Sequence, residues 1–138
     1  MKILKLHPEA KLPSKANEGD LGYDLYSLEN VTMAFGNRIP YEIRTGIAIQ
    51  FEPGFGGIIK ERSSMAANGF EVCAGVIDNG YIGEIIVLAR CFYGTLFIGK
   101  GQKIAQLIPQ AVVNLEIEEV GSLLHTVRGD KGFGSSGA

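Results

Sequence analysis

The stretch Tyr41-Glu42-Ile43-Arg44-Thr45-Gly46-Ile47-Ala48-Ile49-Gln50-Phe51 alternates isoleucine with polar or small residues. A period of two places alternate side chains on opposite faces of a strand, and β-branched residues favour strands. Further along the chain, the same signal marks residues 57–60, 70–77, 82–89 and 103–113. Turn residues separate these segments at 52–54, 78–80 and 99–101. Many short strands divided by turns predict an all-β barrel or jelly-roll-like domain.

Length and charge narrow the class of protein. The chain has 138 residues, enough for one compact domain, with 13 basic against 15 acidic side chains. Because such a balance gives no broad basic surface, and no apolar run approaches the roughly 20 residues of a membrane span, we expect neither nucleic acid nor membrane as a partner. The first residues lack the apolar core of a signal peptide, and Cys73 and Cys91 form no C-x-x-C pair. We therefore expect a cytoplasmic protein with two buried thiols.

Residues 62–69 (RSSMAANG) predict one short helix. A serine can cap its start, Ala and Met favour helix, and Gly69 can end it in the left-handed conformation. Its amino end carries Arg62 and the hydroxyls of Ser63 and Ser64. The segment is either an anion-binding site or an ordinary capped surface turn.

Residues 75–85 (GVIDNGYIGEI) predict two strands joined by a tight turn, and residues 88–98 predict a compact hairpin. Asp78 ends an apolar run, so its carboxylate is expected at the edge of the core. It is either a turn residue or a general base, since an ionised carboxylate can orient and deprotonate a water. Tyr81 either covers the barrel edge or offers its ring to a sugar.

Asp24 lies between Tyr23 and Leu25 in a strand-like pattern. A carboxylate in such a place needs a partner. That partner is either a structural hydrogen-bond donor or, through water, a magnesium ion that also binds substrate phosphates.

The last eleven residues, 128–138, contain four glycines, two serines and two cations around Phe133. This composition cannot build a core element. The segment is either a disordered tail or a mobile arm in which Arg128 and the serines bind an anion while Phe133 stacks on a ring. We accordingly divide the chain into a β-barrel domain, residues 1–127, and a Gly/Ser-rich arm, residues 128–138.

Taken in order, five segments resemble the motifs of the trimeric dUTPase (dUTP nucleotidohydrolase) family. They are Gly22-Tyr23-Asp24-Leu25; Arg62-Ser63-Ser64-Met65-Ala66; residues 75–78 with Tyr81, Gly83 and Glu84; residues 101–107 (GQKIAQL); and Arg128-Gly129 with residues 132–137 (GFGSSG). The resemblance spans nearly the whole chain.

This resemblance implies a distorted jelly-roll-like β-barrel in a homotrimer, with the arm exchanged between subunits and each active site assembled from all three. It implies a magnesium-dependent dUTP diphosphatase that splits dUTP into dUMP and pyrophosphate by water attack on the α-phosphorus. Such an enzyme supplies dUMP for thymidylate synthesis and keeps uracil out of DNA.

The resemblance also assigns roles. Asp78 would activate the water, and Tyr81 would pack under the deoxyribose. The backbone from about Cys73 to Ile77 would read uracil. The remaining assignments are Gly75, Val76 and Ile77 for the base; Arg62, Ser63, Ser64 and Gln106 for the phosphates; Asp24 for magnesium through water; and Arg128, Phe133, Gly134, Ser135 and Ser136 for the arm.

Two alternatives remain open: a dCTP deaminase-like nucleotide enzyme, which has a similar Arg-Ser-Ser segment, and a regulatory binding protein with the dUTPase fold. The chain also departs from the family pattern at Glu61, Gly80 and Gln102. Glu61 matters most because it precedes Arg62, and we expect its carboxylate to point outward.

Overall fold

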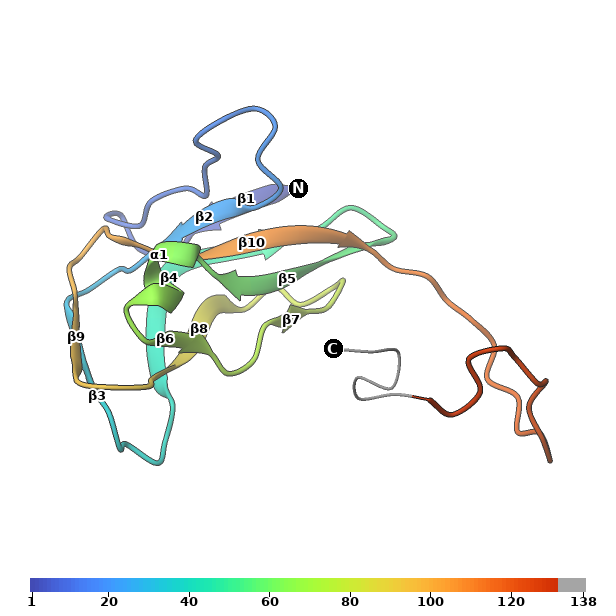
Figure 1. Ribbon diagram of the computed structural model, residues 1–138. Coiled ribbons are helices and arrows are strands. Elements are labelled where there is room, and N and C mark those ends of the chain that lie inside the picture. Colours follow the sequence, from blue (N-terminus) through green and yellow to red (C-terminus); the bar gives the residue numbers. More distant parts are fainter. Residues whose placement is uncertain (132–138) are drawn as a thin grey trace.

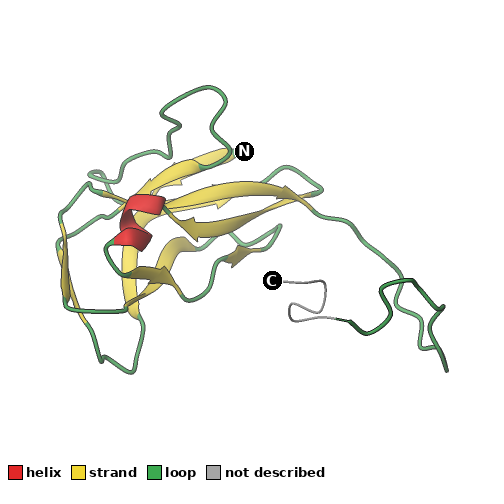
Figure 2. Cartoon of the chain, viewed as in Figure 1, coloured by secondary structure: helices red, strands yellow, loops and turns green. Residues whose placement is uncertain are grey.

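The computed structural model describes residues 1–131. In that range the chain forms ten strands and one short helix (Figures 1 and 2). The elements are β1 (Lys2–Lys5), β2 (Tyr23–Tyr26), β3 (Val31–Ala34), β4 (Tyr41–Gln50), β5 (Phe55–Glu61), α1 (Ser63–Ala67), β6 (Phe70–Val72), β7 (Val76–Ile77), β8 (Glu84–Cys91), β9 (Thr95–Ile98) and β10 (Lys103–Ala111).

The strands form two four-stranded sheets, β1-β4-β8-β6 and β2-β10-β5-β7, and a two-stranded sheet, β3-β9. All pairings are antiparallel. One buried cluster takes side chains from both larger sheets, including Ile43, Ile85, Leu25 and Leu107. The all-β, jelly-roll-like architecture is therefore confirmed, as is the single short helix.

Strand β4 follows the alternation in its sequence until a bulge interrupts it. Ile43, Ile47 and Ile49 are buried, and the register against β8 shifts between Arg44 and Ala48. Gly46 lies in this bulge with φ +69°, and a Cβ there would lie 2.9 Å from the Cβ of Ala10. Glycine is required both for the backbone conformation and for the space.

The prediction of one strand over residues 70–77 was wrong. β6 pairs with β8, whereas β7 pairs with β5 in the other large sheet. The chain crosses between the sheets at Gly75, where a Cβ would lie 2.4 Å from the carbonyl oxygen of Ile59. Periodicity in a short apolar run does not reveal which partner each half will find.

Two predicted hairpins were also wrong in their pairing. Residues 75–85 contain a turn, but β7 and β8 belong to different sheets. Residues 88–98 contain the end of β8 and all of β9, yet β9 pairs with β3, with Thr32 opposite Phe97. In both cases a distant strand supplies the hydrogen-bonding edge, which local turn chemistry cannot indicate.

Helix α1 confirms the predicted ending but not the predicted cap. Gly69 has φ +83° and ends the turn, as expected. The N-cap residue is Arg62, and it makes no side-chain capping bond, so a serine cap is wrong. Met65 is 4% exposed and anchors the helix in the core.

After β10 the chain leads away from the sheets (Figure 1), and residues 112–131 are exposed and contain no helix or strand. The division at 127/128 stays a prediction. Phe133, Gly134, Ser135 and Ser136 lie outside the described residues.

Cys91 is buried as expected, but Cys73 is exposed, and its expected burial was wrong. Within residues 1–131 no helix is long and apolar enough to cross a membrane. A cytoplasmic location stays a prediction.

Candidate active site

A cavity of about 340 Å³ lies against β7, the turn that follows it, and β8. We call it the Asp78 cavity. It is lined by Val76, Ile77, Asp78, Tyr81, Glu84, Ile86 and Leu88, together with Glu42 of β4. Its wall is mostly apolar, and the polar exceptions are carboxylates and one phenol.

This cavity exists because two strand edges separate. β6 pairs only with the last part of β8, from Ala89 to Cys91, and the backbone N–H of Cys73 donates to the carbonyl of Leu88 at 2.8 Å. Beyond that point β7 bonds to β5, while the first half of β8 bonds to β4. Within residues 1–131, β7 and the first half of β8 therefore each have one edge without a strand partner, and both line the cavity. Their main-chain donors and acceptors are available to a planar ligand.

Asp78 and Tyr81 lie on the turn beside these edges. The N–H of Tyr81 donates to the carbonyl of Asp78 at 3.2 Å. The Asp78 side chain is exposed and has no ion-pair partner in the described part of the chain. Tyr81 is 47% exposed, and its hydroxyl donates to the carbonyl of Glu84 at 3.0 Å. A carboxylate able to accept a proton therefore sits beside an aromatic ring with one open face.

A second cavity, of about 420 Å³, lies where β2 and β10 meet the start of α1. We call it the Arg62 cavity. Its lining is more polar than that of the Asp78 cavity. The lining residues are Ala16, Asp20, Leu21, Gly22, Asp24, Arg62, Ser63, Ser64 and Gln106.

Two cations pair with one carboxylate of the Arg62 cavity, that of Asp24. Asp24 is 8% exposed. It accepts from the Arg62 Nε at 2.9 Å and from the Lys103 Nζ at 2.6 Å. The hydrogen bond to Asp24 raises the pKa of Lys103, against the opposing effect of burial. Two cations therefore share the Asp24 carboxylate, while Asp20, the second carboxylate of the lining, accepts from the backbone and side chain of Asn17 instead. The guanidinium and ammonium groups are charged donors of the kind that bind anions.

Lys103 was missed by sequence reasoning. It is opposite Tyr26 in the pairing of β10 with β2, two residues from Asp24. Only the register of these strands brings the ammonium to the carboxylate, and no spacing in the sequence indicates it.

The hydroxyl and amide groups of the Arg62 cavity remain accessible to a ligand. Ser63 and Ser64 are exposed at the first turn of α1. Gln106 donates from its Nε2 to the carbonyl of Glu61 at 3.1 Å. Its side chain lies over Gly22, where a Cβ would come within 2.5 Å of the Gln106 Oε1. A glycine at position 22 thus makes room for the amide.

Glu61 does not line the Arg62 cavity. Its carboxylate pairs with the Lys60 Nζ at 3.4 Å. The backbone N–H of Glu61 itself, followed by Lys60, lowers the pKa of this carboxyl, while burial opposes the shift. Its Oε2 is buried without a hydrogen-bond partner in the described residues, so the expectation that this carboxylate points outward was wrong, even though it lies outside the Arg62 cavity.

The donor set fits magnesium only through water. Both oxygens of Asp24 already accept from cations. Within residues 1–131, no three His, Cys, Asp or Glu side chains gather into a metal-binding group. Mg²⁺ commonly keeps several waters and binds through one or two carboxylates plus substrate phosphates, which is compatible with Asp24.

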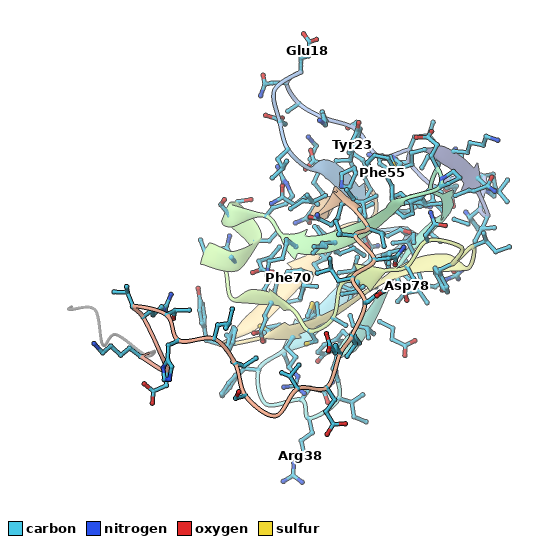
Figure 3. All side chains as sticks on the ribbon, turned by 90° about the vertical axis from the view of Figure 1, so that its right-hand side faces the viewer. Glu18, Tyr23, Arg38, Phe55, Phe70 and Asp78 are labelled. Atoms are coloured by element: carbon cyan, nitrogen blue, oxygen red, sulfur yellow. The ribbon has the colours of Figure 1, made fainter. Side chains whose placement is uncertain are left out.

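The two cavities are far apart on one chain. β2 and β7 are opposite edges of one sheet, with β10 and β5 between them, so three strand spacings of about 4.8 Å separate them. Ile77 is opposite Gly57 of β5. Arg62 is five residues further along the chain from Gly57, which is about 17 Å in an extended strand. Figure 3 shows Asp78 and Tyr23, the neighbour of Asp24, in separate parts of the molecule. No phosphate held by Ser63 and Ser64 can reach Asp78 of the same chain.

A family model described as dUTPase matches residues 8–137. The chain belongs to the dUTPase family. Deoxyuridine 5'-triphosphate nucleotidohydrolases of Mycolicibacterium gilvum (strain PYR-GCK) and Mycobacterium leprae (strain TN) are each 41% identical to it over 145 residues. Each match covers 98% of this chain and 93% of the relative.

Solved structures agree with this membership. The Staphylococcus bacteriophage 80alpha dUTPase with dUPNHPP superposes with a TM-score of 0.90 at 25% identity, covering 99% of this chain and 98% of the phage chain. A mutant dUTPase from phage phi11 of S. aureus superposes with a TM-score of 0.79 at 23% identity, covering 88% of this chain and 97% of the phage chain. The phi11 protein is described as coordinating a structural Mg(II) ion.

In this dUTPase-family chain the predicted site residues fall into three groups. Val76, Ile77, Asp78 and Tyr81 line one cavity, with Gly75 at the crossing beside it. Asp24, Arg62, Ser63, Ser64 and Gln106 line the other. Arg128 lines neither cavity; its Nε donates to the carbonyl of Lys131 at 3.0 Å. The roles assigned to these residues stay predictions.

Proposed function

We propose that this chain hydrolyses dUTP to dUMP and pyrophosphate with Mg²⁺. The observation that carries the proposal is the Asp78 cavity, where two unpaired strand edges and a carboxylate without an ion-pair partner among residues 1–131 border one space. Relatives at 41% identity bear the name of this nucleotidohydrolase, which favours hydrolysis over the deaminase and regulatory alternatives.

Uracil recognition would fall to the main chain around Gly75, Val76 and Ile77. A pyrimidine ring presents donors and acceptors along one edge, and a strand edge presents the same groups at fixed spacing. The 5-methyl group of thymine would need space that main chain packed closely against uracil leaves no room for. Tyr81 would pack its open face under the deoxyribose and exclude a 2'-hydroxyl.

Asp78 would act as the general base. A water held by its carboxylate attacks the α-phosphorus and gives its proton to Asp78. The new P–O bond completes dUMP, and the bond from the α-phosphorus to the bridging oxygen breaks, so pyrophosphate leaves. Such a reaction depends mainly on positioning and on neutralising charge.

Arg62, Ser63, Ser64 and Gln106 would hold the phosphate chain. Their guanidinium, hydroxyl and amide groups are the donors that phosphate oxygens accept. Mg²⁺ would neutralise phosphate charge, with Asp24 orienting its water shell. Because Lys103 also neutralises Asp24, the Arg62 guanidinium would keep charge available for the substrate phosphates.

The separation of the two cavities favours assembly of the site from several copies. A general base must be within hydrogen-bond reach, or one water, of its proton. Because Asp78 and Arg62 of one chain are much further apart, we propose a homotrimer in which they meet across an interface. Arg128 and Phe133 would come from the arm, with Phe133 stacking on the base.

The test of the activity is a hydrolysis panel of dUTP, UTP, dCTP and dTTP with magnesium. We expect pyrophosphate from dUTP and little from the other three. Ammonia released from dCTP would instead identify a deaminase, and no turnover of any nucleotide would favour a binding protein.

The test of assembly mixes two inactive variants, Asp78→Asn and Arg62→Ala. After denaturation and joint refolding, random assortment places both intact residues in about a quarter of shared sites. Activity should therefore return on mixing, with a trimer by sedimentation. Sites built within single chains would stay inactive in the mixture, which would refute the shared site.

A further inference from the structure

Glu84 lies at the first position of β8, where its carboxylate binds β4 and its carbonyl accepts a hydrogen bond from Tyr81. Its Oε1 accepts from the N–H of Gly46 at 2.8 Å. The Arg44 guanidinium donates to the same carboxylate, from Nε at 3.1 Å and Nη2 at 3.0 Å. The side chain is only 17% exposed. Both carboxylate oxygens are therefore used within the protein, although Glu84 borders the Asp78 cavity.

The bulge in β4 explains why a carboxylate is needed here. Arg44 is opposite Ile86 and Ala48 is opposite Glu84, so four steps along β4 span two along β8. Backbone groups inside such a bulge lose their ladder partners. Glu84 replaces the missing acceptor for Gly46, whose positive φ and close contact with Ala10 restrict any rearrangement.

The main chain of Glu84 holds the ring of Tyr81. The Tyr81 hydroxyl donates to the Glu84 carbonyl at 3.0 Å, and the ring folds over Gly83, where a Cβ would lie 2.5 Å from that hydroxyl. With 47% of Tyr81 exposed, packing alone fixes the ring weakly. Its angle depends on where the Glu84 carbonyl is, and the Glu84 carboxylate fixes that position.

We propose that Glu84 is a positioning residue that sets the angle of Tyr81 against the sugar, and with it the preference for deoxyribose over ribose. The inference rests on the proposed function, because it takes Tyr81 to contact the sugar. Glu84 itself touches no reacting atom. Arg44 contributes to the same positioning, since its guanidinium holds the Glu84 carboxylate over the bulge.

The experiment compares kcat/KM for dUTP and UTP in the assembled protein and in Glu84→Ala. We expect the ratio of the two to fall about tenfold, because a small displacement of a positioning group is costly in the transition state. Glu84→Gln should recover part of the ratio, since its amide oxygen still accepts from Gly46. A purely structural role would lower both rates equally and leave the ratio unchanged.

Two further variants complete the test. Glu9→Gln is the matched control, because it removes an exposed ion pair, with Lys100, outside both cavities, and its ratio should match that of the unaltered protein. Arg44→Ala covers the case in which Glu84→Ala does not fold. A ratio within about twofold of the unaltered protein in Glu84→Ala, or in Arg44→Ala where Glu84→Ala does not fold, would overturn the inference.

The affinity ratio of dUMP over UMP, measured by calorimetry, provides a readout that does not need turnover. It should fall in Glu84→Ala or, if that variant does not fold, in Arg44→Ala; an unchanged ratio would contradict the role of Glu84. Absence of dUTP hydrolysis by the unaltered protein would contradict the proposed function instead.

Discussion

In the Asp78 cavity the Asp78 carboxylate is exposed and has no ion-pair partner among residues 1–131, whereas in the Arg62 cavity Asp24 is buried against two cations. The first cavity is framed by strand edges and apolar side chains. The second is framed by charged, hydroxyl and amide groups. Within the described part of the chain, the lining of the Asp78 cavity contains no cation, whereas that of the Arg62 cavity contains Arg62.

This difference agrees with the roles proposed for the two regions. A general base has to be available to accept a proton, and a cation next to it would hold it in the charged form. A site for a polyanion needs cations that are already oriented, and a buried carboxylate orients them. The separation of the two regions on one chain is the reason for proposing that a complete site takes them from different copies.

The largest effect should come from Asp78→Asn. Loss of a general base lowers turnover by about 10² to 10⁴-fold. Because Asp78 is exposed, the free energy of unfolding should change by no more than about 0.5 kcal/mol. Steady-state pyrophosphate release and urea unfolding measure the two quantities. Retained turnover would remove Asp78 from the mechanism.

Deletion of residues 129–138 should have the next largest effect. Loss of a stacking ring and of anion donors should reduce turnover by roughly 10- to 100-fold, since one base stack contributes about 1 to 3 kcal/mol. Among residues 1–131 the last strand, β10, ends at Ala111, so sedimentation should still give the trimer. Full activity of the shortened chain would refute the arm.

Asp24→Asn should distinguish the cavities by stability. It leaves Arg62 and Lys103 without their shared carboxylate, and the free energy of unfolding should fall by about 1 to 3 kcal/mol. Asp78→Asn is the matched control, as it changes the same group in the other cavity. Equal stability of the two variants would show that Asp24 does not organise the cations.

Glu61→Gln should have the smallest effect. Since the pKa of Glu61 is lowered in the fold, its ionised form stabilises the protein above its ordinary pKa, and that contribution disappears as the pH falls through the lowered value. Unfolding in urea should show a loss below about 1 kcal/mol at pH 7, and this loss should shrink as the pH falls below the ordinary pKa of the carboxyl. Turnover of dUTP should not change; a marked increase would mean that this carboxylate opposes phosphate binding.

Local patterns predicted those elements whose causes are local. The alternation over residues 41–51 predicted β4, and Gly69 predicted the end of α1. The split at Gly75 was not predictable, because it depends on the carbonyl of Ile59 and on β5 as a partner. Lys103 was missed for the same reason, since its neighbour Asp24 lies on a distant strand.

The sequence by itself determined the all-β class and the one short helix, because strand alternation, a helix-ending glycine and turn residues act within a few positions. Only the tertiary structure decided which strands pair, where the two cavities lie and which cations share Asp24. These depend on register between segments distant in the chain, and a single residue of register moves every side chain to the other face. The sequence therefore predicted the Asp78 and Arg62 groups, and the tertiary structure placed them in two separate cavities.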